Sequence, residues 1–421
     1  MRPSFLPCIL LVASSLLLSA PAHGADENPT TDELVERLGS KRFNERERAA
    51  KSLAERGPKV LPALRLALKH ADGEVSTRAQ KLIAALEIVE VMEPKRLTLD
   101  TNKQPLAVAI NQIERQTGCK LLVDEKDPTA LYSFQMKGAT LWEVLQKLNA
   151  EAGLVHVDYR AGTYKLVPGI YTSPFRWSHG SFWLVAQKFD EHKSIDFSEL
   201  GMNNERTKQD DYLKLAVSVR VEPRFLILGF DEPEIEIALD ENGKAFGKTN
   251  TTEDRKRLAL AKKTFDGETV YLCLHRTDKN AKAIRELRGW IPVRVVVERK
   301  RVLVTDDFLK SNGTKFQLGE ATYEIANTRH LGNIITSLSI SGPRFSPEID
   351  SRWPDRVRFE DADGNRWVSE TNLVTQTADE EIRLTYFNTR TPKAGPQKMY
   401  VEEWKVVEYR IPFEFKNIPL P

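Results

Sequence analysis

The stretch LTLDTNKQPLAVAINQIERQTGCKLLVD, residues 97–124, changes its hydrophobic spacing twice. Leu97 and Leu99 alternate with polar residues, which is typical of a strand with one buried face. From Pro105 onward the apolar residues recur three and four positions apart, which predicts a helix that ends at Gly118. Apolar residues after that glycine predict a second strand.

The same order of elements follows a second time. Residues 132–136 alternate, apolar residues within 141–148 keep helical spacing, and Gly153 ends the pattern as Gly118 does. Residues 164–167 add a closing strand. Because two units with matching ends are improbable by chance, we predict a small βαβ-repeat domain.

The repeat resembles the short N-terminal (STN) domain of secretins and TonB-dependent receptors, over residues 94–170. The features in common are the strand before Pro105, the Leu-Ala-Ile helix with its Gly118 stop, the helix entry at 138–141 and the Gly153 stop. In that family the domain is a periplasmic docking module without catalytic residues, so the resemblance implies docking. No barrel or secretin region follows, so a transport role does not carry over.

Residues 25–93 are predicted to be helical. Three apolar stripes at helical spacing are separated by Gly57-Pro58 and by a turn at Asp72-Gly73. The pattern resembles HEAT repeats. It is shorter than the roughly three repeats that a solenoid needs, so we expect a stub that leans on a neighbouring domain.

Residues 1–24 have the pattern of a secretory signal peptide. Arg2 precedes the apolar run 9–20, and small residues at Ala22 and Gly24 suit a signal peptidase. We therefore expect a periplasmic or extracellular protein; an uncleaved anchor is the alternative. No later segment is apolar enough to predict a membrane span.

The charge balance argues against a nucleic-acid-binding protein. The formal net charge is only +2, whereas a nucleic-acid binder needs a basic face. The charged run 298–301 is expected to close a hairpin between two apolar strands. Cys119 and Cys273 lie in apolar runs and are expected to be core residues rather than a disulfide framework.

Beyond residue 170, short alternating runs are broken by turn residues. This spacing predicts two antiparallel β-sandwich-like domains, 171–309 and 310–421, with one short helix at 255–263. The whole chain is thus predicted to be a multidomain α+β protein. Its C-terminal half resembles uncharacterised β-rich regions of exported bacterial proteins.

Gly247-Lys248-Thr249 is similar to the end of a phosphate-binding loop. That motif also needs a glycine where this chain has Asn242, and it must connect a buried strand to a helix. Both requirements fail here, so a polar hairpin loop is the better interpretation and no nucleotide cofactor is predicted.

Asp361, Asp363 and Asn365 alternate like calcium ligands. An EF-hand loop would need glycine and glutamate where Arg366 and Asn372 stand. A β-turn explains the same residues without a metal.

Histidines give no catalytic or metal signature. None of the seven pairs with another His or a Cys at ligand spacing, and no Gly-x-Ser-x-Gly elbow occurs. His156, in a predicted strand, is expected to be a satisfied sheet histidine. We therefore predict no catalytic, cofactor-binding or metal-binding residue.

One aromatic segment is the candidate contact surface. Residues 171–189 contain Tyr171, Phe175, Trp177 and Trp183, which could stack on a glycan or anchor a partner. Some of these aromatics alternate as strand residues do, so core packing is the stronger hypothesis.

The residues together favour an exported, non-enzymatic interaction or scaffold protein of the bacterial cell envelope, docking on a protein partner through its helical and STN-like modules. The alternative is a protein that binds cell-wall glycan or another small ligand through the aromatic segment. A hydrolase with an unrecognised site is a third, weaker hypothesis.

Overall fold

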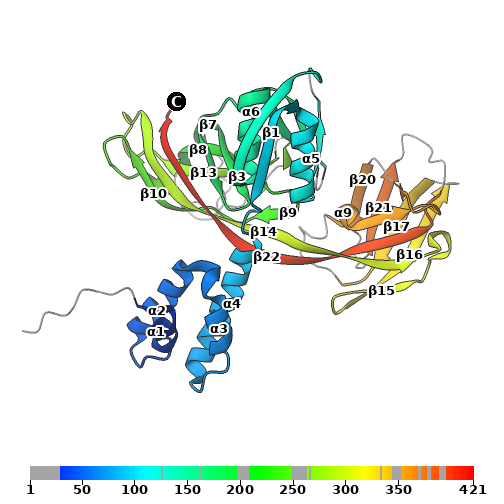
Figure 1. Cartoon of the computed structure of the whole chain (residues 1–421), viewed down its shortest axis with the longest axis horizontal. Coiled ribbons are helices and arrows are strands. Elements are labelled where there is room, and N and C mark those ends of the chain that lie inside the picture. Colours follow the sequence, from blue (N-terminus) through cyan, green and yellow to red (C-terminus); the bar gives the residue numbers. More distant parts are fainter. Residues whose placement is uncertain are drawn as a thin grey trace, which may run out of the picture. The chain divides into compact units, whose positions relative to one another are not determined.

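The computed structural model describes residues 29–421 except 125–126, 161–162, 197–207, 249–262, 265–266, 332–333, 344–351, 368–370, 377–380 and 388–394. The protein is mixed α+β with several antiparallel sheets (Figure 1). It divides into two compact units, Met1–Glu90 and Val91–Pro421. The helix predicted at 255–263 lies mostly outside the described residues. No helix in the described ranges is long and apolar enough to cross a membrane.

The first unit is helical. A capping box at Thr30 and Glu33 starts its first helix, because each side chain bonds the other residue's backbone N–H. Arg78 forms an ion pair of 2.6 Å with Glu74 of its own helix and links two helices through a second ion pair of 2.9 Å with Glu47. Its elements are α1 (Thr31–Arg37), α2 (Phe43–Glu55), a 3₁₀ turn (Gly57–Val60), α3 (Leu61–Ala67) and α4 (Gly73–Val91).

The second unit begins with two strand–helix–strand segments, here called the βα module (residues 97–168). Its helices end at Gly118 and Gly153, as predicted, and both glycines have the left-handed φ values, 72° and 62°, that favour glycine. The elements are β1 (Leu97–Pro105), α5 (Leu106–Thr117), β2 (Lys120–Val123), β3 (Leu131–Ala139), α6 (Leu141–Ala152), β4 (Leu154–Arg160) and β5 (Thr163–Pro168).

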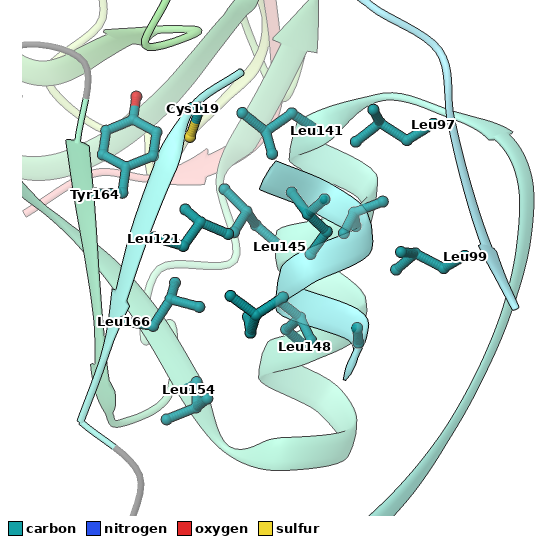
Figure 2. Packing of buried hydrophobic residues seen from close by; sticks show 14 of the residues in the cluster. Leu97, Leu99, Cys119, Leu121, Leu141, Leu145, Leu148, Leu154, Tyr164 and Leu166 are labelled. Carbon is teal, nitrogen blue, oxygen red and sulfur yellow. The ribbon is translucent and has the colours of Figure 1, made fainter. Parts of the chain in front are cut away.

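The helices of the βα module lie between two small sheets. Strands β1 and β3 form an antiparallel pair, and the other sheet has the order β2-β5-β4. Figure 2 shows Leu97 and Leu99 on one side of the helices and Leu121 and Leu166 on the other. The alternating leucines of each strand thus enter one shared core.

The next sheet, here called sheet C, is antiparallel, in the order β11-β13-β8-β7-β6, with β12 beside β13. The start of the aromatic segment leads into its first hairpin, β6–β7, which contains Trp177 and Trp183. The strands are β6 (Arg176–His179), β7 (Phe182–Asp196), β8 (Lys208–Val221), β11 (Gly247–Lys248), β12 (Lys263–Thr264) and β13 (Gly267–His275).

A larger sheet, sheet D, is built around two long strands, β14 (Ala283–Thr305) and β22 (Lys398–Pro419), which run side by side (Figure 1). Strands from both sides of the boundary predicted at 309/310 therefore share one sheet. Its order is β10-β14-β22-β18-β19, with β9 beside part of β14; the bounds are β9 (Leu226–Phe230), β10 (Glu234–Asp240), β18 (Val357–Glu360) and β19 (Arg366–Trp367).

The prediction that residues 298–301 close a hairpin is wrong. They lie inside β14, where Lys300 is opposite Glu403 and Arg301 is opposite Glu402. Lys300 and Glu403 form an ion pair of 3.8 Å. Acidic residues on β22 thus neutralise the basic residues of this run, and the run continues as a strand instead of forming the predicted turn.

The last sheet packs on the distal part of sheet D. Val302 and Val401 lie in one hydrophobic core with Tyr323, Ile325 and Leu338. The strand β14 therefore contributes to this core and also pairs with β9 and β10 of its own sheet. The last sheet has the order β15-β16-β17-β21-β20, and its elements are β15 (Lys315–Leu318), β16 (Ala321–Leu331), β17 (Ile334–Ser341), β20 (Thr371–Gln376) and β21 (Glu381–Phe387), with a short helix α9 (Trp353–Arg356) and a 3₁₀ turn (Phe308–Lys310) nearby in the chain.

Candidate functional site

The aromatic segment meets the βα module at a buried junction. Trp183 of β7 is only 1% exposed and belongs to the core of the module. Its ring lies 5.7 Å from that of Trp142 in α6. Neither indole N–H finds an acceptor among the described residues, so the two rings are held by packing rather than by hydrogen bonds.

His156 of β4 is the polar centre of this junction. It is 1% exposed, and its Nε2 lies 3.0 Å from a guanidinium nitrogen of Arg220 in β8. Its Nδ1 contacts the hydroxyl of Tyr171. Because a guanidinium can only donate, Nε2 must accept and the proton must sit on Nδ1. A neutral imidazole therefore links the module to sheet C.

The electrostatics of the junction keep both titratable rings neutral. Burial, followed by the nearby charge of Arg220, lowers the pKa of His156 well below its usual value of 6.5. Burial raises the pKa of Tyr171 to about 12. At neutral pH, the histidine is thus an acceptor for Arg220 and not a second cation beside it.

Two further hydrogen bonds cross near the junction. The Tyr164 hydroxyl of β5 donates to the carbonyl of Val221 in β8 at 2.8 Å. The Ser181 hydroxyl donates to the carbonyl of Met92, which precedes the module, at 2.9 Å. Rings, an imidazole–guanidinium pair and backbone acceptors therefore fix the βα module to sheet C.

The four predicted contact residues lie in different surroundings. Tyr171 and Trp183 come together at the junction, with ring centroids 5.6 Å apart. Trp177 is half-buried and donates its indole N–H to the carbonyl of Pro412 in β22 at 3.2 Å. Phe175 is also half-buried. That these residues contact a ligand stays a prediction, now concentrated on Phe175 and Trp177.

Sequence reasoning placed His156 in a sheet but missed its partner. Arg220 stands between Val219 and Val221 in a strand whose neighbours are buried, and it is 9% exposed. A lone arginine in an apolar strand could have indicated a buried polar contact, since a buried charge needs a partner. The identity of that partner depended on tertiary contact.

The module also presents two different strand edges. On β1, Thr98 exchanges hydrogen bonds of 2.8 and 2.9 Å with the Gln116 amide. Asp100 does the same with Gln112, at 3.2 Å for each bond. The two α5 glutamines thus occupy the edge that a neighbouring strand would use. β3 pairs only with β1 among the described strands.

The two sequence motifs that resembled a calcium loop and a phosphate-binding loop have no such geometry in the described residues. Asp361 accepts backbone N–H bonds from Asp363 and Asn365, at 3.0 and 2.8 Å, which is a turn geometry. Gly247 and Lys248 form β11, and Thr249 lies outside the described residues. No cluster of His, Cys, Asp and Glu within the described ranges could hold a metal ion.

Comparison of the chain with protein-family models, with curated proteins and with solved structures finds no significant match.

Proposed function

We propose that the protein is an exported, non-enzymatic docking protein of the bacterial cell envelope. In this proposal the helical stub and the βα module, an STN-like domain, receive a protein partner, and the β sheets form the scaffold. The order β1-α5-β2 and β3-α6-β4, with its two glycine stops, supports the STN-like assignment. The observation that carries the docking role is the difference between two strand edges: glutamines of α5 cover the edge of β1, whereas no described strand pairs with the outer edge of β3.

The register identifies which backbone groups β3 offers. In an antiparallel pair, opposite residues either bond each other or turn both groups outward. Asp100 turns its N–H and C=O to Gln112 and lies opposite Gln135. Gln135 therefore turns its own N–H and C=O away from β1. A partner segment in extended conformation can bond there and extend the sheet.

Replacing Gln135 by proline should abolish this docking. Proline removes the outward N–H but no bond to β1, and edge strands tolerate it. The matched control, Gln135→Ala, removes the side chain and keeps the backbone donor. Both full-length variants and the wild type would be cross-linked in envelope fractions, and their captured proteins compared by mass spectrometry.

The docking proposal requires a partner that wild type and Gln135→Ala share and Gln135→Pro loses. Equal capture by all three chains would contradict strand addition at β3. The same fractions test export: recovery of the chain only in the cytoplasm, with residues 1–24 retained, would contradict it.

Glycan binding is the second candidate, because an exposed tryptophan lies beside the segment. Trp290 is 38% exposed and is opposite Pro412, whose carbonyl accepts from Trp177. Sugar rings stack on such faces. Trp177→Ala and Trp290→Ala should then each weaken co-sedimentation with peptidoglycan, whereas Phe43→Ala, which removes a 61% exposed aromatic ring in α2, should not. Unchanged co-sedimentation of the first two variants would remove both aromatics from a glycan site.

A further inference from the structure

Arg299 occupies an unusual position in the middle of β14. It lies opposite Trp404 of β22. Its Nε and Nη2 are closed to solvent and have no hydrogen-bond partner in the part of the chain that the structure describes. Burial lowers the pKa of this guanidinium, with the charge of Arg358 adding to the effect. Its third nitrogen, Nη1, is not among these buried atoms.

Glu402, the carboxylate with the largest effect on the pKa of Arg299, already has other partners. Glu402 is 7% exposed and accepts the Trp404 indole N–H at 3.0 Å. Its other oxygen lies 3.4 Å from Nε of Arg358. The next carboxylate, Asp355, lies 3.4 Å from Arg352. The charges of both carboxylates thus act on Arg299 electrostatically, but neither carboxylate accepts a hydrogen bond from it.

More positive charge lies on the same side of the sheet. The Arg356 guanidinium is 4.7 Å from the ring centroid of Trp353 and 5.3 Å from that of Trp404, and its Nε donates to the Glu402 carbonyl at 3.0 Å. The rings offer it a cation–π environment and no oxygen. Glu402 is thus the ion-pair partner of Arg358 and also the carboxylate with the largest effect on Arg299.

This arrangement lacks one acceptor. A guanidinium has five N–H donors, and leaving buried donors unpaired is costly. An oxyanion supplies two or more acceptor oxygens and a negative charge, and Arg recognises such groups through paired hydrogen bonds. A ligand can approach Arg299 from solvent on the side of Nη1, and Arg358 provides a second positive charge close to Arg299.

We propose that Arg299, with Arg358 and Trp404 beside it, forms a binding site for the oxyanion group, phosphate or carboxylate, of a small ligand. The site is separate from the β3 edge and does not depend on the docking role. The competing explanation is that Arg299 belongs to a purely structural ion network.

Arg299→Met separates the two explanations. If an anion is the missing partner, the anion-free protein should lose nothing when the unpaired buried charge is removed. The variant should then be at least as stable as the wild type in chloride, and it should lose the response to anions. In a structural network the same substitution would destabilise the protein in every buffer. Arg301→Met is the control, because Arg301 is exposed on the same strand and pairs with Glu360 at 3.6 Å.

Thermal unfolding and calorimetric titration of the full chain would be measured with inorganic phosphate, acetate and chloride at equal ionic strength. The wild type and Arg301→Met should show a saturable rise in Tm and measurable binding with phosphate, with acetate, or with both; Arg299→Met should show neither. Response to phosphate alone assigns a phosphate ligand, and response to acetate alone a carboxylate. Absence of a saturable response in the wild type, an intact response in Arg299→Met, or a loss of its stability in chloride would each overturn the proposal.

Discussion

Replacing Trp183 by alanine is expected to lower the free energy of unfolding by about 3–5 kcal/mol, the usual cost of deleting a buried tryptophan. The side chain is 1% exposed and packs against Trp142 and the ring of His156. Its loss opens a cavity at the junction of the βα module and sheet C. Urea unfolding followed by circular dichroism measures the change.

Trp290→Ala is the matched control, because Trp290 is 38% exposed. It should cost much less, since most exposed positions change stability by about 0.5 kcal/mol or less. Equal unfolding midpoints for Trp183→Ala and the wild type would contradict the core role. Trp183 would then return to the candidates for ligand contact.

Acidification is expected to destabilise the protein through His156. Its folded-state pKa lies well below 6.5 because the ring is buried beside Arg220. Above pH 6.5 the ring is neutral in both states, and the stability is fully present. Below pH 6.5, His156 takes up a proton in the unfolded chain but stays neutral in the folded chain. This single group should therefore lower the stability by about 1.4 kcal/mol per pH unit until the folded pKa is reached.

The contribution of His156 is measured by comparing how the free energy of unfolding changes with pH in the wild type and in variants. His156→Gln should reduce the slope of unfolding free energy between about pH 6.5 and 5, even if it lowers stability at neutral pH. Trp290→Ala is the control, because this substitution removes no titratable group, and its slope should match that of the wild type. Identical slopes in all three proteins would show that His156 does not titrate as described.

Local patterns were sufficient for the elements of the βα module. The spacing of Leu97 and Leu99, the helical stripe after Pro105 and the stops at Gly118 and Gly153 all have counterparts in the structure. These features depend on neighbours a few residues away, through side-chain periodicity and backbone φ, so a single sequence carries them.

Charge and aromatic residues were less informative. The run 298–301 predicted a hairpin, yet it continues a long strand because Glu402 and Glu403 face it from β22. For the aromatic segment, the sequence did not decide between core packing and a surface contact. Trp183 became a core residue because α6 of the module covers it, while Trp177 remained half-buried beside β22.

The sequence by itself determined the alternation of strands and helices in the module and the points at which its helices end. Only the tertiary structure decided that β14 and β22 join strands from both predicted β domains, that His156 meets Arg220, 64 residues later, and that Nε and Nη2 of Arg299 meet no acceptor among the described residues. The physical reason is range: periodicity and glycine stops act within a few residues, whereas strand partners and buried charge pairs depend on which distant segments meet.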